Sequence, residues 1–365
     1  MTCNRCGANE EKYFIEGVCR RCIHLDFGVV ESVFDDFSDD GEYELKFELT
    51  PYQKSISQEI VSMIEKGDIF LEAVCGAGKT EMCYDLLKKC ITEKKTIGWA
   101  IPRRQVVLEL KDRIQEDFKA CKVVAVCGGH TDDLLGDVIL CTTHQLYRYH
   151  QYFDILIVDE PDAFPFSGDD LLFGLMKKSV KGKILFMSAT KDDALIQKLN
   201  NTQHLKMPLR PSLEPLPIPI LRNNLIHLVF DFILHKDEKQ LFFVPTKKMA
   251  VSLSKLFKIP YITSSSEDKE RIIGSFKSDT KGKLIATTIL ERGVTFKDVF
   301  VYVIEANHPI FDVSSLIQIS GRVLRGSSTK GACYFYTTQK CEEVLLCIET
   351  LINTNTLAES VLNPK

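Results

Sequence analysis

The stretch Ile69-Phe-Leu-Glu-Ala-Val-Cys-Gly-Ala-Gly-Lys-Thr80 decides how the rest of the sequence is interpreted. Its mainly apolar first half, as far as Val74, predicts a short buried strand, and the pattern from Glu81 to Cys90 predicts an amphipathic helix. A turn of small residues joins the two. A strand, a glycine turn and a helix in this order form the setting of a phosphate-binding loop. The sequence therefore predicts that this turn binds phosphate.

The residues of this loop have separate expected roles. The segment that ends in Gly78-Lys79-Thr80 fits the P-loop pattern, with alanine at its first position. Gly76 and Gly78, with Ala77 between them, let backbone N–H groups converge on phosphate oxygens at a helix N-terminus. Lys79 can reach the β- and γ-phosphates of ATP, and the Thr80 hydroxyl can hold Mg²⁺. A chance glycine turn is the competing interpretation, which the context on both sides disfavours.

The composition indicates a globular protein. A length of 365 residues, with 45% hydrophobic and 26% charged residues, is enough for two ordinary domains and a small module. The net charge of −4 means that any nucleic-acid site must be a local basic patch. No apolar run has the length of a membrane span, and the first residues lack the shape of a signal peptide. We therefore expect a cytoplasmic protein without a transmembrane segment.

Four of the 13 cysteines form a regular pattern, Cys3-x2-Cys6-x12-Cys19-x2-Cys22, whereas the other nine lie in apolar segments and are expected to be buried thiols. Each CxxC pair supplies two thiolates from one tight turn, and tetrahedral Zn²⁺ takes four. The pattern predicts a closed, structural zinc site in a module of residues 1–25. A redox dithiol is the alternative.

The order of the expected elements predicts two α/β domains. Residues 26–48 contain nine acidic residues and one lysine, which indicates a solvated linker or a weakly ordered pair of strands. Over residues 49–206 short apolar strands alternate with helical patterns, as in a parallel sheet covered on both faces. Five prolines mark residues 207–219 as a second linker, and the alternation resumes over residues 220–365.

Strands are expected at 69–74, 96–101, 122–126, 137–141, 154–159 and 183–187 in the first domain, and at 240–244, 260–263, 283–286, 299–304 and 332–336 in the second. Helices are expected at 51–66, 81–90, 103–118, 225–235, 246–257, 267–278, 314–320 and 339–352.

An acidic pair follows the P-loop by about eighty residues. The apolar run Asp154-Ile-Leu-Ile-Val-Asp159 predicts a strand that ends at Asp159-Glu160. In a P-loop enzyme the first carboxylate holds Mg²⁺ together with the P-loop hydroxyl, and the second positions and activates the attacking water. An ordinary loop start is the alternative, but after a P-loop the pair favours ATP hydrolysis.

From about Leu49 to Thr337 the sequence resembles the superfamily 2 helicases, because their motifs I to VI occur here in order. The segments that carry this resemblance are Gly78-Lys79-Thr80, Asp159-Glu160-Pro161-Asp162, Ser188-Ala189-Thr190, Leu241–Thr246, Thr287–Thr295 with Arg292-Gly293, and Gln318-x-x-Gly321-Arg322-x-x-Arg325. The resemblance implies two tandem RecA-like P-loop domains with parallel sheets, here preceded by the four-cysteine module.

The resemblance also implies roles for residues outside the P-loop. Gln53 would pair with the adenine edge, since one amide offers both a donor and an acceptor. Arg322 and Arg325 would reach the γ-phosphate as arginine fingers, and Gln318 would help to close the site around nucleotide and water. For the arginines a solvated basic helix face is the alternative. Pro161 departs from the Asp-Glu-Ala-Asp box of many RNA-remodelling helicases, but it leaves the two functional carboxylates untouched.

Contacts to a nucleic-acid backbone are expected where other strands end. Hydroxyls, backbone N–H groups and a helix N-terminus bind phosphates there without reading the base sequence. Each threonine could instead be a helix cap. The residues expected to contact the polymer are Pro102, Arg103, Arg104, Gly129, Thr142, Thr143, Thr287 and Thr288.

The four-cysteine N-terminus and the segment Asp159–Pro165 are similar to the late-competence ComFA family, which moves single-stranded DNA inward during natural transformation. This resemblance implies an ATP-dependent DNA helicase or translocase that uses ATP, Mg²⁺ and Zn²⁺. It also implies competence proteins and a membrane DNA channel as partners, at the inner face of the cell membrane.

Two alternatives remain open. Among enzymes, an RNA helicase or a replication-restart DNA helicase has the same motifs and differs in the polymer. The second alternative is not an enzyme but a nucleotide-gated adaptor, which binds ATP without productive turnover. The presence of Glu160 and Arg325 argues against the adaptor, because a scaffold needs neither a water-activating carboxylate nor an arginine finger.

Overall fold

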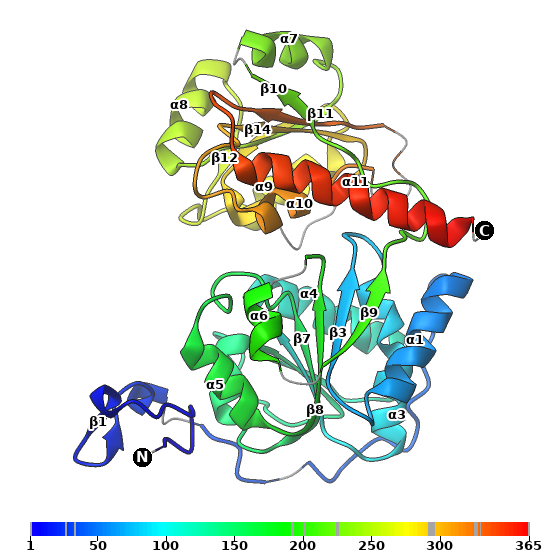
Figure 1. Cartoon of the computed structure of the whole chain (residues 1–365), viewed down its shortest axis with the longest axis vertical. Coiled ribbons are helices and arrows are strands. Elements are labelled where there is room, and N and C mark those ends of the chain that lie inside the picture. The colour runs from blue at the N-terminus through cyan, green and yellow to red at the C-terminus, as the bar shows by residue number, and fades with distance from the viewer. Residues whose placement is uncertain are drawn as a thin grey trace. The chain divides into compact units, whose positions relative to one another are not determined.

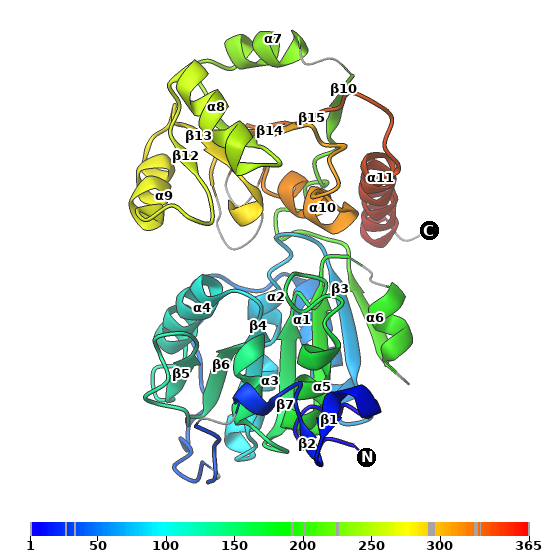
Figure 2. The ribbon, with the colours of Figure 1, turned by 90° about the vertical axis from the view of Figure 1, so that its left-hand side faces the viewer.

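The computed structural model describes residues 2–25, 28–32, 34–190, 193–199, 202–223, 226–290, 296–324, 328 and 330–363. Its contacts divide the chain into two units: unit 1 comprises residues 1–73 and 78–207, and unit 2 comprises residues 74–77 and 208–365. Each unit has a β-sheet with helices packed on it (Figures 1 and 2). Arg325 and the segment 291–295, with Arg292-Gly293, lie outside the described residues.

The described strands of unit 1 form a seven-stranded sheet in the order β5-β6-β4-β7-β8-β3-β9, in which every pair is parallel. The strands are β3 (Ile69–Ala73), β4 (Ile97–Ile101), β5 (Val123–Val126), β6 (Val138–Thr142), β7 (Phe153–Asp159), β8 (Val180–Ser188) and β9 (Gln203–Met207). The helices are α1 (Pro51–Met63), α2 (Lys79–Met82), α3 (Tyr84–Thr92), α4 (Arg104–Asp117), η3 (Thr143–Arg148), α5 (Asp170–Ser179) and α6 (Asp193–Lys198).

The apolar runs of unit 1 are buried on both faces of this sheet. Every residue of β4 and β6 is buried, as expected for parallel strands covered by helices. Packing is close enough that a Cβ atom on Gly98 would lie 2.6 Å from the Phe153 ring. The sheet therefore forms the core on which the connecting loops are held.

In unit 2 the described strands form a parallel six-stranded sheet in the order β10-β15-β14-β11-β13-β12. The strands are β10 (Ile220–Arg222), β11 (Lys239–Phe243), β12 (Tyr261–Ile262), β13 (Lys283–Ala286), β14 (Val299–Ile304) and β15 (Cys333–Tyr336). The helices are α7 (Ile226–Leu234), α8 (Lys247–Phe257), α9 (Lys269–Ser278), η4 (Thr288–Leu290), α10 (Val313–Ser320) and α11 (Glu342–Leu362). Within this unit α7 and α8 lie on one side of the sheet, and α10 and α11 lie together on the other (Figures 1 and 2).

The predicted strands of both domains and their parallel arrangement are confirmed. The helix expected at 81–90 differs, because it is interrupted at Cys83 between α2 and α3. The helix expected to end at 352 continues to Leu362. Its turn-forming Asn355 is accommodated because its side chain hydrogen-bonds both backbone groups of Leu216. Strands β9 and β10 were not predicted, since they are edge strands with exposed residues and weak apolar patterns.

The N-terminal module packs on unit 1. It contains η1 (Glu11–Tyr13), the hairpin of β1 (Phe14–Ile15) and β2 (Val18–Cys19), and η2 (Ile23–Leu25). The carbonyl oxygen of Cys6 packs against Gly174 of α5. A Cβ atom on residue 174 would lie 2.0 Å from this oxygen and would clash with it. Only glycine permits this approach.

The acidic segment 26–48 contains no strand in its described part and follows the surface of unit 1. The backbone N–H of Val30 donates to Arg148, that of Ser38 to the Asp137 carboxylate, and that of Glu44 to Asp117. No helix in the described part of the chain is long and apolar enough to cross a membrane.

Candidate functional site

Three sequence motifs meet at one edge of the sheet of unit 1. The P-loop follows β3, the pair Asp159-Glu160 stands at the end of β7, and Ser188 ends β8. These strands are neighbours in the order β7-β8-β3. Because the carboxyl ends of parallel strands lie at the same edge, the topology brings the three motifs together at the usual ligand position of an open α/β sheet.

The P-loop has the backbone conformation that its glycines predict. Gly76 and Gly78 have φ angles of 84° and 80°, in the left-handed region where other residues are strained. A Cβ atom on Gly78 would also lie 2.5 Å from Nε2 of Gln53. Helix α2 begins at Lys79, directly after Gly78, so the N–H groups of its first turn are presented at the loop.

The structure places Lys79 opposite Asp159. The Lys79 Nζ lies 3.6 Å from Oδ1 of Asp159, and each side chain is 15% exposed. A cation and a carboxylate that remain partly accessible at this edge can bind phosphate oxygens and a divalent cation respectively.

Arg113 on α4 is a residue at this site that sequence reasoning missed. Its Nη2 donates a 2.6 Å hydrogen bond to the Thr80 hydroxyl, and its Nη1 lies 3.5 Å from the Glu81 carboxylate. Magnesium coordination by Thr80 would require this hydrogen bond to open. The guanidinium can move because it is largely exposed. No local pattern distinguishes Arg113 from the other charged residues of its helix.

The acidic box is fixed to β8 by the buried Asp162. Its carboxylate accepts hydrogen bonds from the Ser188 hydroxyl at 2.7 Å and from the Thr190 hydroxyl at 3.0 Å. Glu160 has a φ of 53°, and its backbone N–H donates to the Met187 carbonyl at 2.8 Å. A glutamate in the left-handed region is strained, so the surrounding hydrogen bonds are what hold the Glu160 backbone in this conformation.

Gln53 is buried at the start of α1 and takes part in its capping box. Its Oε1 accepts from the backbone N–H and the hydroxyl of Thr50, at 2.9 and 3.0 Å. The side chain therefore both caps α1 and lies against Gly78. Adenine recognition by Gln53 remains a prediction.

The expected phosphate contacts of unit 1 lie farther along the same edge, after the neighbouring strands β4, β5 and β6. Arg104 is exposed at the start of α4, and its Nη2 lies 3.6 Å from the position of a Cβ on Gly129. Among the described side chains none caps the N-terminus of α4 at Arg103, so its N–H groups can face an anion. Pro102, Thr142 at the end of β6 and Thr143 after it are buried. Of the contacts expected in this described part of unit 1, the two arginines and Gly129 are therefore the more accessible ones.

Unit 2 has a corresponding edge at the ends of β11, β12 and β13. Thr287 and Thr288 follow β13, and Thr287 is buried. Thr246, after β11, caps α8 by accepting from the Met249 N–H. After β12 the hydroxyls of Thr263 and Ser265 lie 3.1 Å apart. This last group was missed, although its Thr-Ser-Ser-Ser run after an expected strand was a usable signal.

Gln318 and Arg322 belong to α10 and the turn after it, and both are buried. The turn is held by Arg210, a second residue that the sequence did not reveal because its segment was interpreted as a linker. Arg210 is buried and donates to the carbonyl oxygens of Gly321, Val323 and Leu324, at 3.2, 3.2 and 2.8 Å. A guanidinium at a helix C-terminus satisfies carbonyls that have no partner within the helix.

The four N-terminal cysteines converge as their spacing predicts. Their sulfur atoms all lie within 4.8 Å of one another, with Cys3 and Cys22 at 3.5 Å and Cys6 and Cys19 at 3.7 Å. These distances are too long for disulfides and close to the ~3.8 Å between ligands of tetrahedral zinc. The residues present therefore fit a closed site for a soft divalent cation.

The thiols of this cluster differ in acidity. Burial raises the pKa of Cys3, but hydrogen bonds from the backbone N–H groups of Cys6 and Arg5 outweigh burial and lower that pKa to about 7. Burial and hydrogen bonds to the neighbouring thiols raise the pKa of Cys22 instead. Four sulfur atoms this close cannot all be thiolates unless a cation offsets their repulsion.

Comparison with known proteins assigns the chain to a family. It is 35% identical over 360 residues to the competence protein ComFA of Streptococcus pneumoniae, covering 89% of this chain and 83% of that protein. It is 31% identical over 400 residues to the competence protein ComFA of Bacillus subtilis, covering 98% and 86%. The chain belongs to the ComFA family.

Two broader families match separate parts of this ComFA-family chain. The type III restriction enzyme res subunit family matches residues 46–193, and the helicase conserved C-terminal domain matches residues 222–327. The chain is therefore an ATP-hydrolysing enzyme of helicase superfamily 2, as the ordered motifs predicted.

Solved structures show the same fold at low sequence identity. Mss116p bound to single-stranded RNA and AMP-PNP has a TM-score of 0.62 and 20% identity, covering 84% of this chain and 72% of that one. RecG bound to a three-way DNA junction has a TM-score of 0.57 and 21% identity, covering 90% and 50%. The prediction of two RecA-like domains with parallel sheets, preceded by a four-cysteine module, is confirmed.

The Arg210 contacts generate a prediction about turnover. We expect Arg210→Lys to lower the kcat for ATP by about tenfold, because the turn that carries Arg322 loosens. An ammonium has three N–H donors, whereas Arg210 binds four carbonyls, those of Cys75, Gly321, Val323 and Leu324. ATP affinity should fall less than kcat, since Lys79 and Thr80 are unchanged and the P-loop loses only the hydrogen bond to the Cys75 carbonyl. Steady-state ATPase kinetics with an ATP-binding titration measure both. Ser212→Ala, two residues away and exposed, is the control, and an unchanged kcat in a folded Arg210→Lys protein contradicts the role.

Proposed function

We propose that this enzyme uses ATP hydrolysis to translocate on single-stranded DNA, and that it drives DNA import during natural transformation. The observation that carries the proposal is the meeting of Lys79, Asp159 and the strained Glu160 at the carboxyl edge of one parallel sheet. Membership of a family whose relatives are named competence proteins supports the biological setting.

In the proposed hydrolysis each residue has one task. Lys79 and the N–H groups from Gly76 to Gly78 bind the β- and γ-phosphates, and Thr80 and Asp159 hold Mg²⁺. The magnesium ion neutralises charge on the phosphates when it is bound. Glu160 accepts a proton from the water that attacks the γ-phosphorus, and the leaving group is ADP.

We propose that the remaining motif residues assist these steps. Arg322 and Arg325 stabilise the charge that develops on the γ-phosphoryl group, and Gln318 helps to order the nucleotide and water. Asp162 connects the acidic box to Ser188 and Thr190, so a shift of the box on hydrolysis reaches the loop after β8.

The proposed polymer contacts of unit 1 are Arg103 and Arg104, the second of which lies beside Gly129, and those of unit 2 are Thr287 and Thr288. The two arginines form a local basic group in a chain of net charge −4. Glutamine at position 318, where many RNA-remodelling helicases have histidine, favours movement along a strand. An RNA helicase is the second candidate, because the similar solved structures are bound to RNA in one case and to DNA in another.

We propose Zn²⁺ as the ion of the four-cysteine site, because four thiolates without an open position suit a structural zinc. The site would stabilise the small module, whose described strands are only two residues long. Competence proteins and a membrane DNA channel at the cytoplasmic face are the proposed partners.

Glu160→Gln tests the catalytic assignment. We expect ATP turnover to fall by about a hundredfold or more while ATP binding is retained, since glutamine keeps the shape but cannot accept a proton. Loss of streptavidin displacement from biotinylated single-stranded DNA should accompany the loss of turnover. ATPase rates, nucleotide titration and the displacement assay measure these three quantities.

The matched control is Glu59→Gln on the exposed face of α1, which should change none of them. Normal turnover in Glu160→Gln would contradict its role. If the unmodified protein hydrolyses ATP but displaces no streptavidin, the protein is an ATPase that does not translocate, and the proposed translocation is contradicted.

Cys19→Ser tests the metal site. We expect the unmodified protein to carry about one zinc ion per chain and the variant to lose it, because three thiolates bind zinc far less tightly than four. Nucleotide binding at the P-loop should survive in the variant. Metal analysis beside nucleotide titration measures both, and Cys341→Ser, outside the cluster, should keep its zinc. Zinc-free unmodified protein would contradict the assignment.

A further inference from the structure

Helix α7 of unit 2 is apolar on two opposite faces. Leu228 and Phe232 pack into the core formed with β11 and α8. The opposite face, which we call the α7 stripe, has the i, i+3, i+4, i+7 spacing of a packing surface. It consists of Ile226 (63% exposed), Val229 (50%), Phe230 (67%), Ile233 (58%) and Leu234 (72%). A helix that is apolar all round is normally buried, so the stripe is expected to be covered by another molecule.

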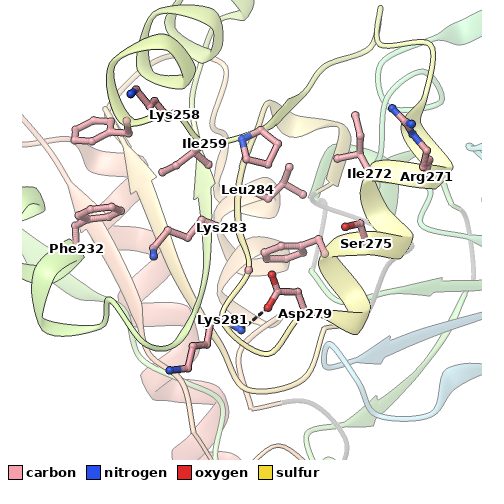
Figure 3. Close-up of a pocket in the computed structure, with 14 residues that line it drawn as sticks. Phe232, Lys258, Ile259, Arg271, Ile272, Ser275, Asp279, Lys281, Lys283 and Leu284 are labelled. Atoms are coloured by element: carbon pink, nitrogen blue, oxygen red, sulfur yellow. Dashed lines mark hydrogen bonds between the residues drawn. The ribbon is translucent and has the colours of Figure 1, made fainter.

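A basic pocket lies next to α7. Its volume is about 650 Å³, and it lies between α7, α8, α9 and the amino-terminal ends of β12 and β13 (Figure 3). We define the basic pocket by Phe232, Lys258, Arg271, Asp279, Lys281 and Lys283. The expected phosphate contacts of unit 2 are at the carboxyl ends of the same strands, so this pocket is separate from them.

The α7 stripe borders the basic pocket through Val229. This residue lines a small apolar cavity together with Phe232, Phe257 and Ile259, which also line the basic pocket. Lys283 Nζ lies 5.4 Å from the centre of the Phe232 ring and donates to the backbone carbonyl of Lys236, just beyond the end of α7. Phe232 in turn packs against Phe257 of α8, with ring centres 5.5 Å apart. In Figure 3 Lys258, Lys283 and Lys281 lie on the left of the pocket, and Arg271 lies on the right.

The positive charges of the pocket exceed the negative charges around them. Asp279 is its single acidic lining residue, against four cationic ones. Lys281 pairs with Asp237 at 3.0 Å, and Arg271 pairs with Asp268 at 3.1 Å. Both ion pairs are more than half exposed, and such pairs contribute little and exchange readily. Lys258 has no ion-pair partner among the described residues. The pocket is therefore suited to carboxylates.

We propose that the α7 stripe and the basic pocket together bind an acidic amphipathic helix of a partner protein. The partner's apolar side chains would cover Phe230 and Ile233, and its carboxylates would face Lys258 and Lys283. This is recognition of a helix by an apolar strip with a charged border.

The geometry disfavours a second copy of this chain as the occupant. A nine-residue helix is only about 13 Å long, too short for the roughly 800 Å² per partner of a stable dimer. Symmetric pairing of two copies would also bring two basic pockets together. Binding of this surface to an anionic membrane is an outcome that the test below distinguishes.

The test uses two synthetic amphipathic peptides with leucines at the same heptad positions. The polar positions carry glutamate in the acidic peptide and lysine in the basic peptide. Fluorescence anisotropy with the full chain should show binding of the acidic peptide alone, weakened by added salt. Phe230→Gln and Lys258→Glu should each weaken binding roughly fivefold or more. Ile352→Gln on α11 and Lys66→Glu after α1, both exposed, are matched controls that should not.

ATPase activity stimulated by nucleic acid should stay normal in all four variants, which separates this surface from the proposed translocase function. Failure of the acidic peptide to bind at about 1 mM overturns the proposal, as does equal binding of both peptides. Self-association abolished by Phe230→Gln in sedimentation velocity, or preferential binding to phosphatidylglycerol vesicles, would assign the surface to another occupant and also overturn it.

Discussion

The Lys79–Asp159 ion pair depends on the register of three parallel strands. Glu72 of β3 pairs with Ser188 of β8, and Met187 of β8 pairs with Asp159 of β7, so the ends of all three strands lie at one level. Side chains alternate between the faces of a sheet, and a slip of one residue would turn these groups to the wrong side. Continuous apolar burial of the strands stabilises this register and thereby the site.

Further contacts fix the positions of the groups at this edge of the sheet. Asp162 binds the acidic box to the loop after β8, and Gln53 connects the start of α1 to the P-loop turn. In unit 2 Arg210 gives the turn after α10 a comparable rigidity. In each case one buried polar side chain satisfies several groups at once, which restricts their alternative conformations.

Sequence patterns predicted the strands, the P-loop and the four-cysteine cluster because each depends on local spacing. The P-loop glycines and the two CxxC pairs can be recognised from the residues next to them in the sequence. The partners of Thr80 and of the turn after α10 could not be predicted in this way, because Arg113 and Arg210 become important only when distant segments pack. The acidic segment 26–48 was equally ambiguous, since its acidic side chains pair with lysines from distant parts of unit 1, such as Glu42 with Lys88 and Glu44 with Lys119, which local spacing does not indicate.

The measurement that tests the central claim most directly is the ATPase rate of the full chain with single-stranded DNA, duplex DNA and RNA, at equal nucleotide concentration. A single-strand DNA translocase should be stimulated strongly by single-stranded DNA and much less by the other two polymers. Equal or greater stimulation by RNA would contradict the account and favour an RNA helicase, because contact with the 2′-hydroxyl distinguishes the two substrates.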